Sequence, residues 1–223
     1  MEFDSFALAA STADLDAEPR ARDRADLVEF RMDLAADPLD ALDDYDGDLP
    51  VLATNRAEWE GGAAGDDDDE RLDALAAAAE RDAVAAVDVE LECLFGAGDR
   101  VAERARAHDT AVVASVHDFE ATPDRERMRE LLVDATDRAD VGKLAVTAES
   151  RSDVLDLLSV TDALDAEGRA VATMAMGEAG RHSRAVAPLY GSRIGYAPVD
   201  AADATAPGQY DLATLSRLVS ELR

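Results

Sequence analysis

The sequence predicts an α/β fold in which eight strands and the helices between them form a single (β/α)8 barrel over residues 1–223. Three observations lead to this prediction: short apolar runs alternate with longer helix-like segments, there are eight such runs, and no linker divides the chain. Strict alternation favours a parallel sheet with helical crossovers. Eight units in one domain of 223 residues are typical of the compact end of the barrel range.

Each element is expected where the pattern changes. The strands are predicted at the apolar runs, which are 6–11, 26–33, 50–56, 86–92, 111–118, 141–146, 170–176 and 193–198. Helix-like patterns follow the third to the sixth strand, at 68–82, 100–109, 122–139 and 150–168. The acidic run GDDDDE at 65–70 is expected to be a solvated loop that enters a helix, because acidic side chains suit a helix N-terminus.

The charge of the chain is strongly acidic. Asp and Glu number 50 against 22 Lys and Arg, which gives a formal net charge of −28 at pH 7. A nucleic-acid-binding protein would carry a basic face, and no basic cluster occurs here, so nucleic acid is not an expected partner. Hydrophobic residues make up 48% of the chain and fall in ordered patterns, so the chain should fold. Acidic residues along its whole length indicate adaptation to high salt, which screens repulsion between carboxylates.

The sequence also limits the cellular compartments in which the protein is expected. No apolar stretch reaches about 18 residues, so no membrane span is expected. The acidic segment 1–11 lacks the basic region of a secretory signal. Cys93 is the one cysteine, which excludes an internal disulfide and a cysteine-based zinc site. A cytoplasmic protein is therefore expected.

Polar residues at alternate strand positions predict a polar barrel interior, because residues two apart share a face of a strand. If the apolar faces meet the helices, the charged faces point inward and need partners. The inward residues are expected on four strands: Glu29, Arg31 and Asp33 on the second, Asp88, Glu90 and Glu92 on the fourth, Ser115 and His117 on the fifth, and Lys143 on the sixth.

Lys143 is the only lysine of the chain, and it lies in an apolar strand between Val141 and Val146. Apolar surroundings and neighbouring cations favour a neutral amine, which can attack a ketone and form a Schiff base. The imine withdraws electrons from the adjacent carbon, and His117 on the next strand is a suitable base for its proton. A carboxylate is expected to orient that histidine.

Two simpler interpretations remain open for these residues. Lys143 could merely neutralise inward carboxylates, and His117 could be a hydrogen-bonded histidine of the core. Their occurrence together on adjacent inward faces favours catalysis.

The sequence resembles the type I 3-dehydroquinate dehydratases across most of its length. The matching segments, in chain order, are EFRMD (29–33), TNRAEWEGG (54–62), VDVEL (87–91), SVHDF (115–119), DVGKLAV (140–146), MAMGEAGRHSR (174–184), YGS (190–192) and TAPGQ (205–209). Each segment alone is weak, whereas the set in this order and at these spacings is highly specific.

The resemblance implies a reaction. Lys143 would form an imine with the C3 ketone of 3-dehydroquinate, and His117 would take the C2 proton and return a proton to the leaving C1 hydroxyl. Glu60 matches the residue that orients the histidine. No metal or organic cofactor is implied, because the lysine supplies the electron sink. Relatives of this kind are often homodimers, which makes a homodimer the expectation here.

The resemblance also implies binding residues. Glu29 and Arg31 match positions at the ring hydroxyls and the reacting region, Arg56 matches a further hydroxyl-binding arginine, and Arg184 matches the arginine that holds the carboxylate. The remaining binding positions are Gln209 on a closing loop, Thr205 in place of the family's usual serine, Ser11 on the first strand, and Met174 and Met176 on the floor of the pocket.

Other residues have simpler interpretations. His108 is expected to face solvent, and His182, near Arg184, is expected to have no role in the site although it could approach it. Trp59 is expected to anchor a loop, and Cys93 to pack as a small side chain. Asp33, Asp88 and Glu90 are expected to line the cavity behind the residues that touch substrate. The alternative to the dehydratase is another Schiff-base barrel lyase such as a class I aldolase, with a phosphate site near the glycines of 177–180.

Overall fold

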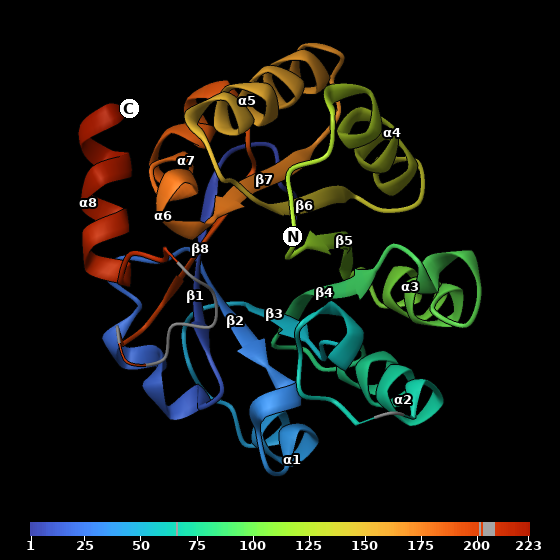
Figure 1. Cartoon of the computed structure of the whole chain (residues 1–223). Helices are drawn as coiled ribbons and strands as arrows, with labels where there is room; N and C mark the ends of the chain where they lie inside the picture. Colours follow the sequence, from blue (N-terminus) through green and yellow to red (C-terminus); the bar gives the residue numbers. More distant parts are fainter. Residues whose placement is uncertain (66, 201, 203–207) are drawn as a thin grey trace.

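Eight parallel strands form one sheet that curls into a nearly closed barrel, with helices around its outside (Figure 1). The computed structural model describes residues 1–65, 67–200, 202 and 208–223. The strands pair in the order β7-β6-β5-β4-β3-β2-β1-β8, which confirms the predicted (β/α)8 fold. They are β1 (Ala7–Thr12), β2 (Leu27–Arg31), β3 (Val51–Thr54), β4 (Val84–Glu90), β5 (Ala111–Asp118), β6 (Val141–Thr147), β7 (Val171–Met176) and β8 (Ile194–Pro198).

The four helices expected after the third to sixth strands are all present. They are α2 (Asp68–Ala78), α3 (Asp99–Ala107), α4 (Arg125–Thr136) and α5 (Arg151–Ala166). The other helices are shorter or later: α1 (Pro38–Asp43), α6 (Gly177–Gly180), α7 (Ser183–Val186) and α8 (Leu212–Leu222), with 3-10 turns η1 (Leu15–Arg20), η2 (Met32–Leu34), η3 (Glu58–Glu60), η4 (Cys93–Phe95) and η5 (Ala187–Tyr190). None of the helices in the described ranges is both long and apolar enough to cross a membrane.

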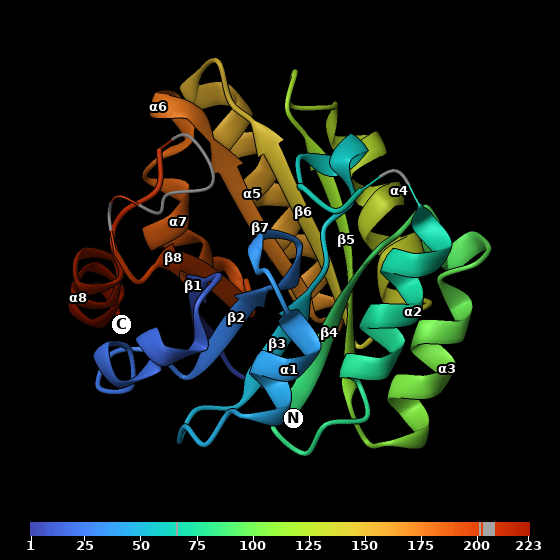
Figure 2. The same ribbon diagram turned by 90° about the horizontal axis from the view of Figure 1, so that it is seen from below.

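Local sequence explains where the helices begin. Asp67 in the acidic run caps α2 by accepting hydrogen bonds from the backbone N–H groups of Asp69 and Glu70. Ser150 and Asp153 form a reciprocal capping box at the start of α5. Figure 2 shows these outer helices lying along the tilted strands β4 to β7.

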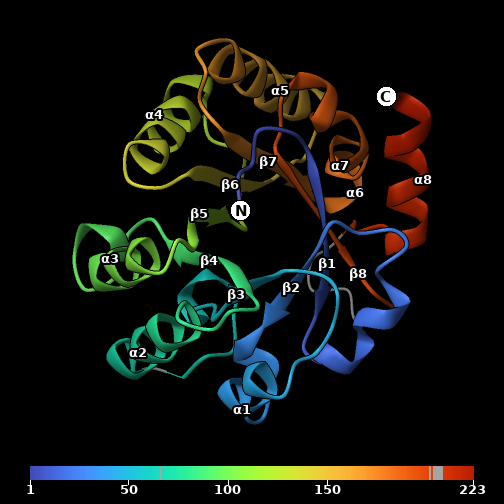
Figure 3. The ribbon, with the colours of Figure 1, turned by 180° about the vertical axis from the view of Figure 1, so that it is seen from behind.

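The gap in the barrel lies between β7 and β8. Only one bridge, Val171 with Ser192, joins the two along the part of the chain that the structure describes. At this bridge the Arg193 N–H donates to the Val171 carbonyl at 2.7 Å. Nearby, the Thr173 N–H donates to the side-chain hydroxyl of Ser192 at 3.0 Å. Seen from behind, β1 lies next to β8 and completes the other side of the ring (Figure 3).

Apolar side chains fill two layers of the molecule. Outside the barrel, residues such as Val28, Phe30 and Val87 pack against the helices. Inside, Leu27 and Leu52 belong to a separate apolar cluster with residues of six other strands. Polar residues are thereby left to the inward positions nearer the C-terminal strand ends, where barrel sites form.

Two of the expected inward positions are not on strands. β2 ends at Arg31, so Asp33 lies in η2, and β4 ends at Glu90, so Glu92 follows the strand and is exposed. The prediction that Glu92 faces the barrel interior is therefore wrong, because alternation stops where the extended backbone stops.

Candidate active site

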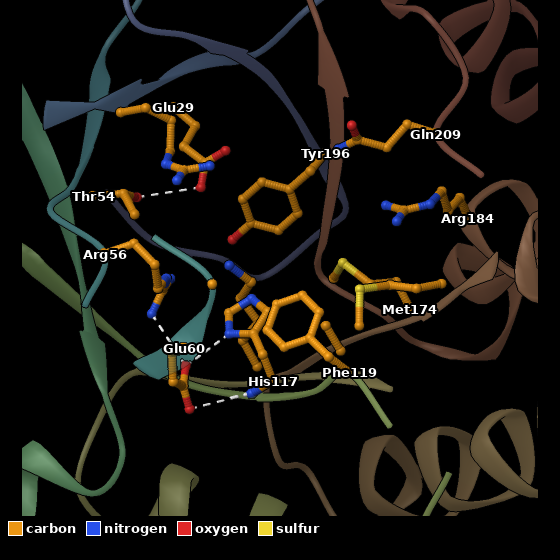
Figure 4. Close-up of a pocket in the computed structure, with 15 residues that line it drawn as sticks. Glu29, Thr54, Arg56, Glu60, His117, Phe119, Met174, Arg184, Tyr196 and Gln209 are labelled. Carbon is orange, nitrogen blue, oxygen red and sulfur yellow. Dashed lines mark hydrogen bonds and ion pairs between the residues drawn. The ribbon is translucent and has the colours of Figure 1, made fainter. Parts of the chain in front are cut away.

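A polar cavity opens at the C-terminal ends of the strands (Figure 4). It brings together ten of the twelve predicted site residues, namely Glu29, Arg31, Arg56, Glu60, His117, Lys143, Met174, Met176, Arg184 and Gln209. The exceptions are Ser11, which lies behind the cavity wall, and Thr205, which falls outside the described residues. Lining residues that the sequence did not single out are Thr54, Gly61, Phe119, Ala145 and Tyr196.

Lys143 lies inside the barrel on β6 and is 4% exposed. Its Nζ forms an ion pair with Asp88 Oδ2 at 2.9 Å and lies 4.4 Å from the centroid of the Tyr196 ring. The expectation of apolar surroundings and neighbouring cations was incomplete, because β4 also supplies a carboxylate that pairs with the amine.

Asp88 holds the lysine from β4 without lining the cavity itself. Its Oδ1 accepts a hydrogen bond from the Ser115 hydroxyl at 2.6 Å and pairs with Arg56 Nη2 at 2.7 Å. Burial alone would raise the pKa of Asp88, but the charges of Arg56 and Lys143 and the hydrogen bond from Ser115 hold it well below its usual value. Asp88 is therefore a fixed negative charge behind the lysine.

His117 and Glu60 form the second titratable pair. His117 Nδ1 lies 2.8 Å from Glu60 Oε2, and the His117 backbone N–H donates to Glu60 Oε1 at 3.3 Å. Burial, Arg56 and Lys143 lower the pKa of His117, and burial raises the pKa of Glu60 to about 8. The imidazole is therefore neutral, and its ring also stacks on Phe119 at a centroid distance of 5.9 Å.

The EGG turn after β3 explains how Glu60 reaches the histidine. Gly61 has a φ of 77°, a left-handed conformation that favours glycine. A side chain at Gly62 would place its Cβ 2.0 Å from the Arg56 carbonyl oxygen. The two glycines thus let the chain double back on Arg56 and direct the Glu60 carboxylate at His117.

Arg56 links the two pairs. Its guanidinium contacts Ser115 at 2.6 Å, Glu90 at 3.2 Å and Glu60 at 3.5 Å, in addition to Asp88. Burial would lower the pKa of Arg56, but these carboxylates raise it well above its usual value. Arg56 lines the cavity, as predicted, yet its donors already serve the protein's own acids.

Behind Arg56 lies a layer of which the sequence predicted Glu90 but not Arg71. Glu90 accepts from the Ala57 N–H at 3.0 Å and pairs with Arg71 Nη1 at 2.8 Å, and both residues are buried. Arg71 belongs to α2, where helical spacing places it on the buried face with Leu75. The sequence signal that could have identified Arg71 is its position among the apolar residues of the helix face that packs inward. Asp88 and Glu90 lie beneath the cavity, behind Arg56 and Lys143, as expected of a second layer, although neither lines the cavity itself.

Glu29 and Arg31 reach the cavity from β2 with partners of their own. Glu29 accepts hydrogen bonds from Ser11 at 2.5 Å and from Thr54 at 3.2 Å. Arg31 donates to both oxygens of Asp33, at 2.8 and 2.6 Å. Ser11 is thus placed to hold Glu29, and Asp33 to hold Arg31.

Arg184 lies on the opposite side of the cavity from Glu29 (Figure 4). It is 5% exposed, and no carboxylate pairs with it among the described residues. Burial alone lowers the pKa of Arg184 to about 10. Met174 and Met176, both buried on β7, lie beside it. A buried guanidinium with no acid beside it is suited to an anionic ligand.

The residues with simpler interpretations are mostly as expected. His108 and His182 are exposed, and Cys93 is half-buried beside Arg71, whose Nη2 lies 3.4 Å from its sulfur. Trp59, which was expected to anchor a loop, is 51% exposed. Among the described residues, no three His, Cys, Asp or Glu side chains gather closely enough to hold a metal ion.

Together, the fold and the site define a class: a (β/α)8-barrel enzyme with a lysine and a histidine in a charged cavity. A model of the type I 3-dehydroquinase family matches residues 8–223. The 3-dehydroquinate dehydratase of Haloarcula marismortui is 61% identical, with 100% of this chain and 99% of that protein covered. That of Halobacterium salinarum is 58% identical, with both chains fully covered. The chain belongs to the type I 3-dehydroquinase family.

Solved structures agree with this assignment. The 3-dehydroquinate dehydratase of Geobacillus kaustophilus is 28% identical with a TM-score of 0.83, covering 98% of this chain and 91% of that one. The type I enzyme of Clostridium difficile is 25% identical with a TM-score of 0.87, covering 98% and 92%. The chain is therefore a lyase that performs a dehydration, which decides against the class I aldolase. The haloarchaeal relatives also fit the expected adaptation to salt.

The layer beneath the cavity gives a stability prediction. Glu90→Gln removes a buried carboxylate shared by Arg56 and Arg71, so the free energy of unfolding should fall by about 3 kcal/mol. Glu92→Gln, two residues later and exposed, should change it by less than about 0.5 kcal/mol. Denaturant unfolding measures both, and equal stabilities for the two variants would contradict the role of Glu90.

Proposed function

We propose that the chain converts 3-dehydroquinate to 3-dehydroshikimate through an imine on Lys143, with His117 as general acid and base. One observation carries the proposal: a single cavity contains Lys143 on its counter-ion, His117 on Glu60, and Arg184 without a described acidic partner. The first two supply the covalent and proton-transfer chemistry, and the third supplies a site for the substrate's carboxylate.

The imine step uses the Lys143–Asp88 pair. The amine gives up a proton, attacks the C3 ketone, and the ketone oxygen leaves as water. The protonated imine carries the same positive charge as the ammonium it replaces. Asp88 therefore remains a suitable counter-ion throughout, and no new buried charge has to be stabilised.

Proton transfer uses the His117–Glu60 pair. Neutral His117 takes the C2 proton, and the electrons of that bond move to the imine nitrogen to give an enamine. The enamine electrons then expel the C1 hydroxyl, which leaves as water with the proton from His117. Hydrolysis of the resulting imine releases 3-dehydroshikimate and restores Lys143. Glu60 holds the imidazole and stabilises its charged form between the two transfers.

Substrate recognition uses both sides of the cavity. Arg184 would bind the carboxylate through two parallel hydrogen bonds. Glu29 and Arg31, on the opposite side and fixed by Ser11 and Asp33, would bind ring hydroxyls. Gln209 already lines the cavity, and with Thr205 it would close over the substrate and exclude water that would hydrolyse the imine.

A family relative supports covalent chemistry. The Clostridium difficile enzyme was solved with covalently modified comenic acid. Its barrel superimposes on 98% of this chain, so a covalent bond to a ligand is compatible with this fold and family.

Borohydride reduction tests the imine. With 3-dehydroquinate present, it should fix the ligand on the peptide that contains Lys143, and mass spectrometry should show the added mass. The assignment is direct because Lys143 is the only lysine of the chain. Lys143→Met should show no adduct and no turnover. An active, unmodified parent protein after reduction would refute the covalent route.

The shifted pKa values give a pH profile. The pKa of Glu60 is raised to about 8, so at lower pH a proton lies between its carboxyl group and His117 Nδ1. His117 can act as a base only after the pair has lost that proton. Below about pH 8, kcat/KM should therefore fall about tenfold per pH unit. Glu60→Gln removes the titrating carboxyl, so the acid limb should move to lower pH while the plateau falls. An unmoved limb in the variant would show that Glu60 does not set it.

Replacement of Arg184 tests the carboxylate site. Arg184→Ala removes charged hydrogen bonds to the substrate, so KM should rise roughly 10- to 100-fold. Arg181→Ala is the matched control, because Arg181 carries the same charge but stacks on Tyr210 at 4.3 Å. Steady-state kinetics measures KM for both variants. Equal KM values for Arg184→Ala and Arg181→Ala would show that the substrate carboxylate binds elsewhere.

A further inference from the structure

Tyr196 lines the cavity with a hydroxyl that has no partner among the described residues and no role in the proposed mechanism. It lies on β8, where Ile194 and Tyr196 face the barrel interior and Ala197 packs outward against α8. The side chain is 4% exposed. Its hydroxyl is buried and has no hydrogen-bond partner among the described residues.

An unpaired buried hydroxyl needs an explanation. Removing a hydroxyl from water without a replacement partner is unfavourable. The ring belongs to an apolar cluster with Ala145, Met174 and Met176, so phenylalanine would bury the same ring there without that cost. Since the part of the chain that the structure describes offers this hydroxyl no partner, it is placed to bond to something that enters the cavity.

The position of the ring shows which part of a ligand it would meet. Lys143 Nζ lies over the ring, 4.4 Å from its centroid. In Figure 4 the hydroxyl points into the cavity, away from Arg184 and toward the side that carries Glu29 and Arg56. The hydroxyl thus faces the end of the cavity where the lysine reacts, and the carboxylate site lies behind it.

The hydroxyl can act there as a donor. Burial, with the negative charges of Asp88 and Glu29, raises the pKa of Tyr196 well above its usual value. The phenol therefore keeps its proton throughout the working pH range. It can donate a hydrogen bond to a neutral oxygen, and it does not compete with His117 as a base.

We propose that the Tyr196 hydroxyl donates a hydrogen bond to an oxygen at the reacting end of the bound substrate and thereby positions that end at Lys143. The inference rests on the proposed function and adds a substrate-positioning residue to it. The oxygen is that of the C3 ketone before the imine forms, or of a ring hydroxyl next to it. Both are neutral acceptors that arrive only with the substrate.

Tyr196→Phe tests this, because it removes the hydroxyl and keeps the ring beneath the lysine. We expect kcat/KM for 3-dehydroquinate to fall about tenfold, the usual effect of losing one such bond. The melting temperature of the substrate-free variant should be unchanged or higher, because no partner is lost. Borohydride should still fix the ligand on Lys143 in the variant. Tyr190→Phe, on an exposed ring of η5, should leave both kcat/KM and melting temperature unchanged.

The outcomes separate this inference from the proposed function. Parent and Tyr196→Phe proteins with kcat/KM values within about twofold of each other would overturn the positioning role alone. A lower melting temperature in the variant would also overturn it, because the hydroxyl would then have a structural partner. A parent protein that does not turn over 3-dehydroquinate would overturn the proposed function, and this inference with it.

Discussion

The pairing of buried charges inside the barrel is the constraint on which the rest of the site depends. A lysine and an arginine on neighbouring walls are stabilised by carboxylates at hydrogen-bonding distance, because removing the partner of a buried ion costs about 3–5 kcal/mol. Asp88 meets this need for both Lys143 and Arg56, at 2.9 and 2.7 Å. In the proposed mechanism, the same carboxylate that stabilises the buried lysine in the fold would also be the counter-ion of the cationic imine. The Lys143–Asp88 ion pair thus serves both the stability of the fold and the proposed chemistry.

The paired charges also make the two walls of the cavity different. Arg56 pairs with Glu60 on the side of His117, and Glu90, which is itself paired with Arg71, pairs with Arg56 from below. The opposite wall, with Arg184, has no described acid to balance it. A ligand with a carboxylate at one end and a ketone at the other fits this division, because its negative end meets the uncompensated guanidinium and its ketone meets the lysine.

The sequence predicted the fold and most of the cavity, for a physical reason. Strand alternation is a local property, so Glu29, Arg31, His117 and Lys143 could be assigned to inward faces before any tertiary structure was known. It failed at Glu92, where the strand had already ended. The resemblance supplied Glu60 and Arg184, whose positions depend on turns. Arg71 was missed because its importance lies in a tertiary contact, the ion pair with Glu90. The Tyr196 hydroxyl was missed because only the tertiary structure shows that it lacks a partner among the described residues.

The most direct test of this account is a crystal structure of the protein after borohydride reduction with 3-dehydroquinate. The account predicts one continuous bond from Lys143 Nζ to the former C3 of the ligand. It also predicts that the ligand carboxylate lies on Arg184, with Asp88 still paired to Arg56. Electron density that ends at the lysine nitrogen, or a ligand carboxylate bound on the Glu29 side of the cavity, would contradict it.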